Sequence, residues 1–150
     1  MTGENPNMMN DPFNLRRFVE AQDPVYDRVR TELTAGEKRS HWMWFIFPQI
    51  AGLGYSSMAA RYAITSLKEA EAYLQHAVLG PRLIECTELV NRISGRSVHD
   101  IFGFPDDLKF GSSMTLFAKA APGNQTFKLA IQKYFNGEYD HRTEELVSAL

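Results

Sequence analysis

Apolar residues recur three and four positions apart along most of the chain, the spacing that places side chains on one face of an α-helix. The first two such sets are Leu15, Phe18, Val19 and Val25, Val29, Leu33. Each set follows an Asp-Pro pair, which combines a cap side chain with a residue whose φ suits the first helical turn. We therefore predict one helix from Asp11 and a second from Asp23, with a stop at Gly36.

Helix starts and stops divide the rest of the chain in the same way. Ser66 and Glu69 have the spacing of a capping box, and Gly80 with Pro81 closes one helix and opens the next. Further starts are predicted at Ser56 or Ser57, Pro105, Asn124 and Asp140. The pattern predicts an all-α fold, a single domain over residues 11–150 with seven or eight short helices. The polar residues 1–10 are predicted to be a flexible leader.

One segment is ambiguous, the aromatic run WMWFIF at residues 42–47. A short apolar run has no period that separates a buried helical turn from a short strand. Elsewhere the chain lacks alternating β-branched residues between hairpin turns. One short strand at residues 42–47 is therefore the single alternative to an all-α chain.

Composition and charge narrow the function classes. A chain of 150 residues is the length of one domain and can bury roughly 70% of its unfolded surface. The 16 Lys and Arg against 18 Asp and Glu leave no basic excess for a nucleic acid. No apolar run approaches the ~20 residues of a membrane span, and the N-terminus lacks a signal-peptide pattern. We expect a cytoplasmic protein, a monomer or weak homodimer, whose single cysteine, Cys86, is buried and unreactive.

The sequence from Gly52 to Ser57 resembles a dinucleotide-binding fingerprint with serine in place of the third glycine. That fingerprint requires a parallel βαβ unit with an acidic residue after the second strand, which the helical pattern does not supply. The favoured interpretation is a tight turn followed by a serine cap. No cofactor is predicted.

Known catalytic and metal-binding motifs are missing from the sequence. The histidines are dispersed, without a second ligand one helical turn away, at His41, His76, His99 and His141. Nucleophile motifs such as G-x-S-x-G and S-x-x-K do not occur. No metal site is therefore predicted.

Polar residues interrupt apolar segments in three places, and we take these as candidate ligand-binding residues. The three groups are His41, Trp44, Gln49; Ser57, Arg61, Tyr62; and Lys109, Ser112, Ser113. Gly111 lies within the third group, and a helical glycine costs about 1 kcal/mol relative to alanine, which indicates the close approach of another group. Aromatic walls with a few serines and cations suit a planar ring that bears an anion.

Each of these residues also has a purely structural explanation, such as a helix cap or a surface ion pair. If these residues instead line a pocket, the helix from Pro105 and the segment 41–49 should lie against each other and share one cavity. Arg61 and Lys109 would hold the anion. Asp106 and Glu69 are the candidate catalytic carboxylates if a reaction occurs.

Four longer motifs give a family resemblance. They are HWMWFIFPQIAGLGYSSMAARYAI, EAEAYLQHAVLGPRLIEC, IFGFPDDLKFGSSMTLF and YFNGEYDHRTEELV. On these motifs the chain from Pro12 onward resembles the bacterial family known as domain of unknown function eighteen-ten, often mislabelled calpastatin. The resemblance implies a small, mainly helical fold. A calpain inhibitor would be a polar, disordered chain, whereas 44% of these residues are hydrophobic.

Three function hypotheses follow from the sequence. The first is a binder of an anionic, ring-bearing small molecule of nucleotide or ADP-ribose type. Its catalytic version would be a hydrolase similar to helical N-glycosidases of NAD-derived substrates. The second is a protein-interaction module that uses the Trp and Phe residues as a hot spot. The third is a nucleic-acid accessory protein, which the balanced charge disfavours.

Overall fold

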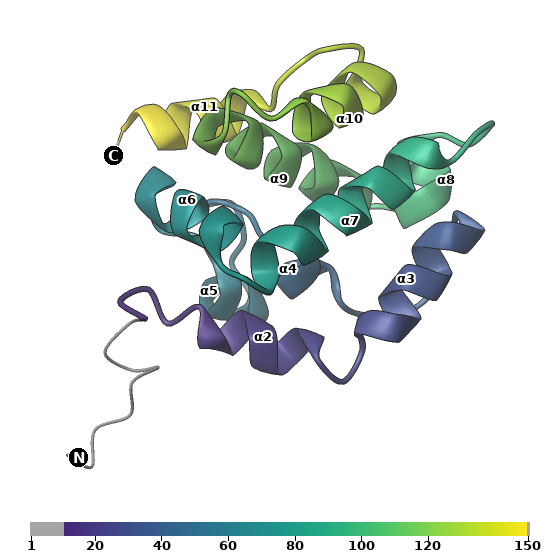
Figure 1. The fold of residues 1–150 in the computed structure, drawn as a ribbon. Coiled ribbons are helices and arrows are strands. Elements are labelled where there is room, and N and C mark those ends of the chain that lie inside the picture. The colour runs from purple at the N-terminus through teal and green to yellow at the C-terminus, as the bar shows by residue number, and fades with distance from the viewer. Residues whose placement is uncertain (1–10, 150) are drawn as a thin grey trace.

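The computed structural model describes residues 11–149, and the predicted leader, residues 1–10, lies outside this range. Within it the chain forms ten helices (Figure 1). Their bounds are α2 Arg16–Gln22, α3 Tyr26–Ala35, α4 Met43–Ile46, α5 Ser57–Tyr62, α6 Leu67–Gln75, α7 Leu79–Arg92, α8 Val98–Phe102, α9 Asp106–Ala120, α10 Gln125–Phe135 and α11 His141–Ser148. The all-α class is confirmed, with ten helices rather than seven or eight.

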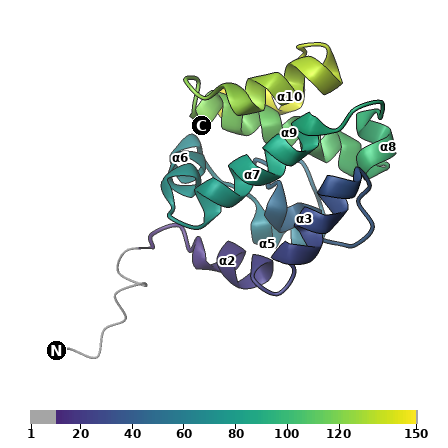
Figure 2. The same cartoon turned by 45° about the vertical axis from the view of Figure 1, so that its right-hand side comes forward.

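The central helix is α9, which packs against α6, α8, α10 and α11 (Figure 1). All of its residues from Phe110 to Ala118 are buried. A helix buried on every side has no polar stripe, and its neighbours must cover it all round. Helix α7 lies across the middle of the molecule and joins α6 and α10 to α3, which comes forward in Figure 2.

Gly111 shows why α9 contains a glycine. A Cβ at this position would lie 3.0 Å from the ring of Phe135 on α10. The predicted close approach is therefore confirmed, and the group that approaches is a core side chain.

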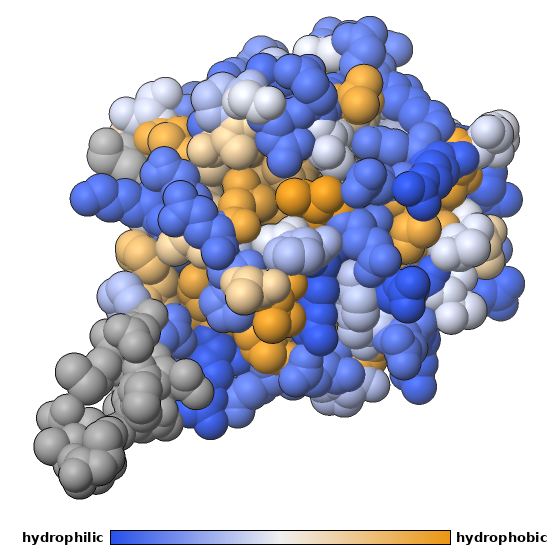
Figure 3. Space-filling model, viewed as in Figure 1, coloured by the Kyte–Doolittle hydropathy of each residue, from blue (hydrophilic) through white to orange (hydrophobic). Residues whose placement is uncertain are grey.

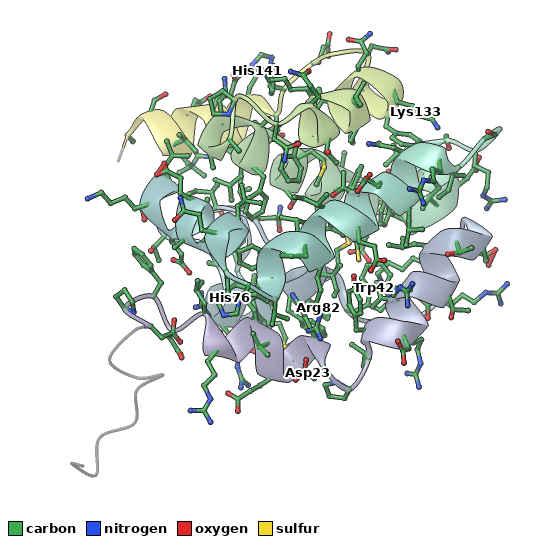
Figure 4. The ribbon with its side chains drawn as sticks, in the orientation of Figure 1. Asp23, Trp42, His76, Arg82, Lys133 and His141 are labelled. Carbon is green, nitrogen blue, oxygen red and sulfur yellow. The ribbon has the colours of Figure 1, made fainter. Side chains whose placement is uncertain are left out.

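The first two helices begin later than predicted. The Asp11 carboxylate accepts the N–H groups of Leu15 at 2.7 Å and Arg16 at 3.0 Å, but the N-cap of α2 is Leu15, and turns lie between Asp11 and the helix. Asp23 ends α2 instead of starting α3. Its carboxylate lies 2.9 Å from Arg82 of α7, and Figure 4 shows the two side chains meeting. A long-range ion pair has replaced the predicted local cap.

The later caps agree better with the sequence. The side chains of Ser66, Asn124 and Asp140 each accept a backbone N–H at the start of α6, α10 and α11. Helix α8 was missed, although Ser97 and Asp100 form a complete capping box at its start. Five residues are too few to display a helical period, so the cap was the only local signal.

The ambiguous run at residues 42–47 contains the four-residue helix α4. An isolated parallel bridge follows it, in which Ile64 N donates to Gln49 O and Ala51 N donates to Ile64 O, both at 2.8 Å. Residues 11–149 contain no strand beyond this bridge. The bridge fixes the chain on both sides of α5, where the candidate site lies.

Apolar side chains on the surface appear in separate patches among hydrophilic ones on the face seen in Figure 3. The large hydrophobic side chains that are most exposed are Tyr55, Phe104, Leu108 and Leu129. No helix of the described chain is long and apolar enough to cross a membrane.

The start of α7 gives a stability prediction. A Cβ at Gly80 would lie 2.0 Å from the backbone oxygen of Leu74, so α6 and α7 meet backbone to backbone. We expect Gly80→Ala to lower the free energy of unfolding by about 3 kcal/mol in urea denaturation, because backbone atoms must move. Gly123→Ala is the control, since nothing lies within 4 Å of a Cβ there. Equal stability of the two variants would contradict the close contact.

Cys86 gives a reactivity prediction. Its side chain is fully buried in α7, and burial raises the pKa of the thiol to about 12. Because the thiolate is the reactive form, the native protein should react with a thiol reagent far more slowly than the urea-unfolded chain. Equally rapid labelling with and without denaturant would show that the thiol is accessible.

Candidate functional site

A cavity of about 270 Å³ opens beside α4 and α5. Its walls come from one stretch of chain: Trp44, Gln49, Ile50, Ala51, Gly52, Gly54, Ala59, Ala60, Tyr62, Ala63 and Thr65. Three of the predicted ligand-binding residues are therefore brought together. They supply two aromatic rings and one amide, the mixture typical of small-molecule sites.

The polar groups of these three side chains share one property. The indole N–H of Trp44, the amide of Gln49 and the hydroxyl of Tyr62 have no hydrogen-bond partner among residues 11–149. Tyr62 is nevertheless only 6% exposed. Trp42 differs, since its indole N–H donates to Glu32 at 2.9 Å. None of these atoms is among the fully buried side-chain atoms without a partner, which are Asn91 Oδ1 and Ser113 Oγ, so a polar ligand would replace solvent at them.

The guanidinium of Arg17 fixes one wall of this cavity. It donates to the backbone oxygens of Arg61 at 2.8 Å and Ala63 at 2.9 Å, and to the Glu69 carboxylate at 3.0 Å. Its other two N–H groups donate to the carbonyls of Phe13 and Asn14. All five donors of Arg17 are thus used within the protein.

A second, more open cleft of about 780 Å³ lies against the same wall. Ala60, Tyr62, Ala63 and Thr65 line both the cleft and the cavity. The charged residues of the cleft are Arg17, Glu20, Arg61 and Glu69. Arg61 is exposed, and its guanidinium lies over the Tyr62 ring, 5.5 Å from the centroid.

Lys109 of α9 meets Trp44 as predicted. Its ammonium lies 5.3 Å from the centroid of the Trp44 ring, so α9 and the segment 41–49 do lie against each other. The predicted shared cavity is wrong in one respect, because no α9 residue belongs to the cavity wall. Lys109 is also 3.7 Å from Asp106, whose other oxygen is 2.9 Å from Lys38.

The two candidate catalytic carboxylates are held by other side chains. Glu69 is buried, and it accepts from the backbone N–H of Thr65 at 2.9 Å and the Thr65 hydroxyl at 2.8 Å, besides its ion pair with Arg17. Asp106 lies between two ammonium groups. Both carboxylates are therefore engaged by other groups of the fold.

The remaining predicted residues are placed apart from the cavity wall. His41 and Ser57 are exposed. Ser112 and Ser113 are buried in α9, where the Ser112 hydroxyl donates to Leu108 O at 3.2 Å. The Ser113 hydroxyl has no partner within the part of the chain that the structure describes.

The histidines stay dispersed in the fold. His76 and His141 lie far apart in Figure 4, between α6 and α7 and at the start of α11. Among residues 11–149, no three His, Cys, Asp or Glu side chains are grouped as metal ligands.

Glu32 of α3 was not predicted as part of this region. Its carboxylate accepts from Trp42 Nε1, the Ser40 hydroxyl and the backbone N–H groups of Arg39 and Ser40. Burial opposes its ionisation, but these hydrogen bonds outweigh burial and lower the pKa of the carboxyl. The available signal was its position three residues after Val29, on the inward face of a predicted helix.

Comparison with known proteins places the chain in a family. A family model described as "Protein of unknown function (DUF1810)" matches residues 12–147. The chain belongs to the DUF1810 family. The resemblance found in the sequence motifs is confirmed.

A solved structure is similar to this chain in both sequence and fold. The crystal structure of the conserved hypothetical protein Rv1873 from Mycobacterium tuberculosis is 61% identical, with a TM-score of 0.91. The match covers 92% of this chain and 99% of the other. No curated protein matches the chain. This DUF1810 protein therefore shares its fold with a solved structure, and any function must be argued from the site.

The Glu32 network gives a pH-dependent prediction. Glu32→Gln should lower the free energy of unfolding by about 2 kcal/mol at neutral pH, because hydrogen bonds to the charged carboxylate are lost. The folded-state pKa is lowered, so this stabilisation is complete above the ordinary Glu pKa of about 4.3. The difference between the variant and the natural chain should shrink as pH falls through the folded-state pKa.

Urea denaturation across a pH series measures this difference. Glu71→Gln is the matched control, because Glu71 is exposed on α6. A constant difference at all pH values for Glu32→Gln would show that the charge of Glu32 is not the source of the effect.

Proposed function

We propose that this DUF1810 protein binds a small molecule that joins a planar ring to an anionic group, of nucleotide or ADP-ribose type. The observation that carries the proposal is the set of polar groups on Trp44, Gln49 and Tyr62, which line one cavity and have no hydrogen-bond partner among residues 11–149. A ligand could form a hydrogen bond with each of these groups, and a typical net contribution is about 0.5–1.5 kcal/mol per bond. The two aromatic rings would stack on a planar ligand.

The size of the cavity limits what enters it. Its volume of about 270 Å³ is just below the roughly 300–1,000 Å³ typical of drug-sized ligands. A single ring system with small substituents suits this volume, and the rest of a larger ligand would lie outside. The open cleft along the shared wall is the available space.

Two cations are close enough to the cavity to attract the anionic group. Arg61 adjoins Tyr62, and it forms no ion pair with any residue from 11 to 149. Lys109 contacts Trp44 but shares the Asp106 carboxylate with Lys38. Arg61 is the better candidate, because its charge is not offset and its planar fork suits an oxyanion.

The proposal contains no bond-breaking step. A hydrolase or N-glycosidase of the type expected from the sequence needs a carboxylate that can polarise water or a substrate hydroxyl. Glu69 and Asp106 are both engaged in ion pairs within the fold. The geometry therefore supports binding better than hydrolysis.

A second candidate function is a protein-interaction module, favoured by one observation. Phe104, in the turn before α9, is 74% exposed, and Leu108, in the first turn of α9, is 57% exposed. This surface differs from the one predicted, because Trp42, Phe45 and Phe47 are buried in the core. Failure of every ring-bearing probe to bind would favour this candidate.

The test of the binding proposal uses Gln49→Leu, which removes the amide and keeps the approximate side-chain size. Adenosine, uridine, AMP and UMP are titrated while thermal stability and tryptophan fluorescence are measured, because a ligand of the native state raises its stability. We expect the best-binding probe to bind Gln49→Leu about tenfold more weakly, the worth of one hydrogen bond to a polar ligand.

Gln125→Leu is the control, since Gln125 is an exposed residue of α10 that lies outside the cavity wall. It should bind all four probes as the natural chain does. Loss of affinity in both variants, or no stabilisation by any probe at millimolar concentration, would contradict the proposed function.

A further inference from the structure

The wall that separates the cavity from the open cleft is a single stretch of chain. Ala60, Tyr62, Ala63 and Thr65 line both spaces, whereas Gln49 lines only the cavity and Arg61 only the cleft. At Ala63 the backbone is extended, and Ile64 pairs with Ile50 in the parallel bridge. One extended backbone has a width of about 5 Å, the spacing of neighbouring strands.

The charges of the cleft are arranged so that one cation is available. Arg17 has used all five of its N–H donors, and its charge offsets that of buried Glu69. Glu20 lies 3.6 Å from Arg16, with both side chains largely exposed. Arg61 has no carboxylate partner within the described chain, so it is the cationic head that remains for a ligand.

We propose that the ligand crosses this wall, with its ring in the cavity of Trp44, Gln49 and Tyr62 and a single phosphate- or carboxylate-type group on Arg61. A spacer about as wide as one backbone, such as a pentose, would pass over Ala60 and Ala63. This inference rests on the proposed function and names its ligand class: ring, spacer and one terminal anion.

The charge balance of the cleft disfavours a longer phosphate chain. Arg17 and Arg61 bring two positive charges, and Glu20 and Glu69 bring two negative ones. A diphosphate or triphosphate would place further negative charge beside Glu20 without a second free cation to receive it. Like charges repel, so added phosphates should gain no affinity.

The experiment measures dissociation constants of adenosine, AMP and ATP, and of uridine and UMP, by thermal stability and tryptophan fluorescence. The proteins are the natural chain, Arg61→Gln, Lys109→Gln and the control Arg28→Gln, an exposed residue of α3. We expect each monophosphate to bind the natural chain roughly 10- to 100-fold more tightly than its nucleoside, the range of a charge-assisted hydrogen bond. ATP should bind no more tightly than AMP.

Arg61→Gln should remove this advantage of the monophosphate and leave nucleoside binding unchanged, whereas Arg28→Gln should change neither. Equal affinity for nucleosides and monophosphates would overturn the inference, while the proposed binding of a ring in the cavity would stand. A loss of monophosphate binding in Lys109→Gln and not in Arg61→Gln would move the anion to Lys109. That result overturns the inference while the proposed function stands. If no probe binds, both are overturned.

Discussion

The cavity and the open cleft both depend on the hydrogen bonds and the ion pair of the Arg17 guanidinium. It binds two backbone oxygens of the shared wall and the Glu69 carboxylate, while Glu69 in turn binds Thr65 at the end of that wall. A guanidinium is planar and permanently charged, and its five donors hold partners at fixed angles. Loss of Arg17 would leave Glu69 as an unpaired buried charge, a change that typically costs about 3–5 kcal/mol.

A second polar network holds the turn that leads into α4. Glu32 orders the turn that leads into α4 through Ser40 and Trp42, and Lys38 links the same turn to Asp106 of α9. The two networks hold the residues next to Trp44 and Tyr62, whose own polar groups have no hydrogen-bond partner among residues 11–149. The protein therefore satisfies the polar groups that build the site and leaves open those that face the cavity.

The sequence predicted local features better than distant ones. Helix type and most caps followed from spacing and polarity, since these signals lie within a few residues of each other. The contact between Lys109 and Trp44, which are distant in the chain, followed only from the expectation that polar residues in apolar segments find partners on other elements. Arg17 and Glu32 were missed because their partners are distant in the chain or belong to the backbone. Asp23 was misread because a good cap residue is equally able to form an ion pair, and only the fold brings Arg82 to it.

The Ile50–Ile64 bridge has a consequence for how relatives of this protein could diverge. It ties together the two ends of a loop that carries Gly52, α5 and Tyr55, whose side chain is fully exposed at the surface. Because the ends are clamped, insertions or deletions near Tyr55 need not disturb the core. Such changes would alter the loop whose Gly52 and Gly54 line the cavity, so the loop is a natural place for engineers to retarget recognition on a constant scaffold.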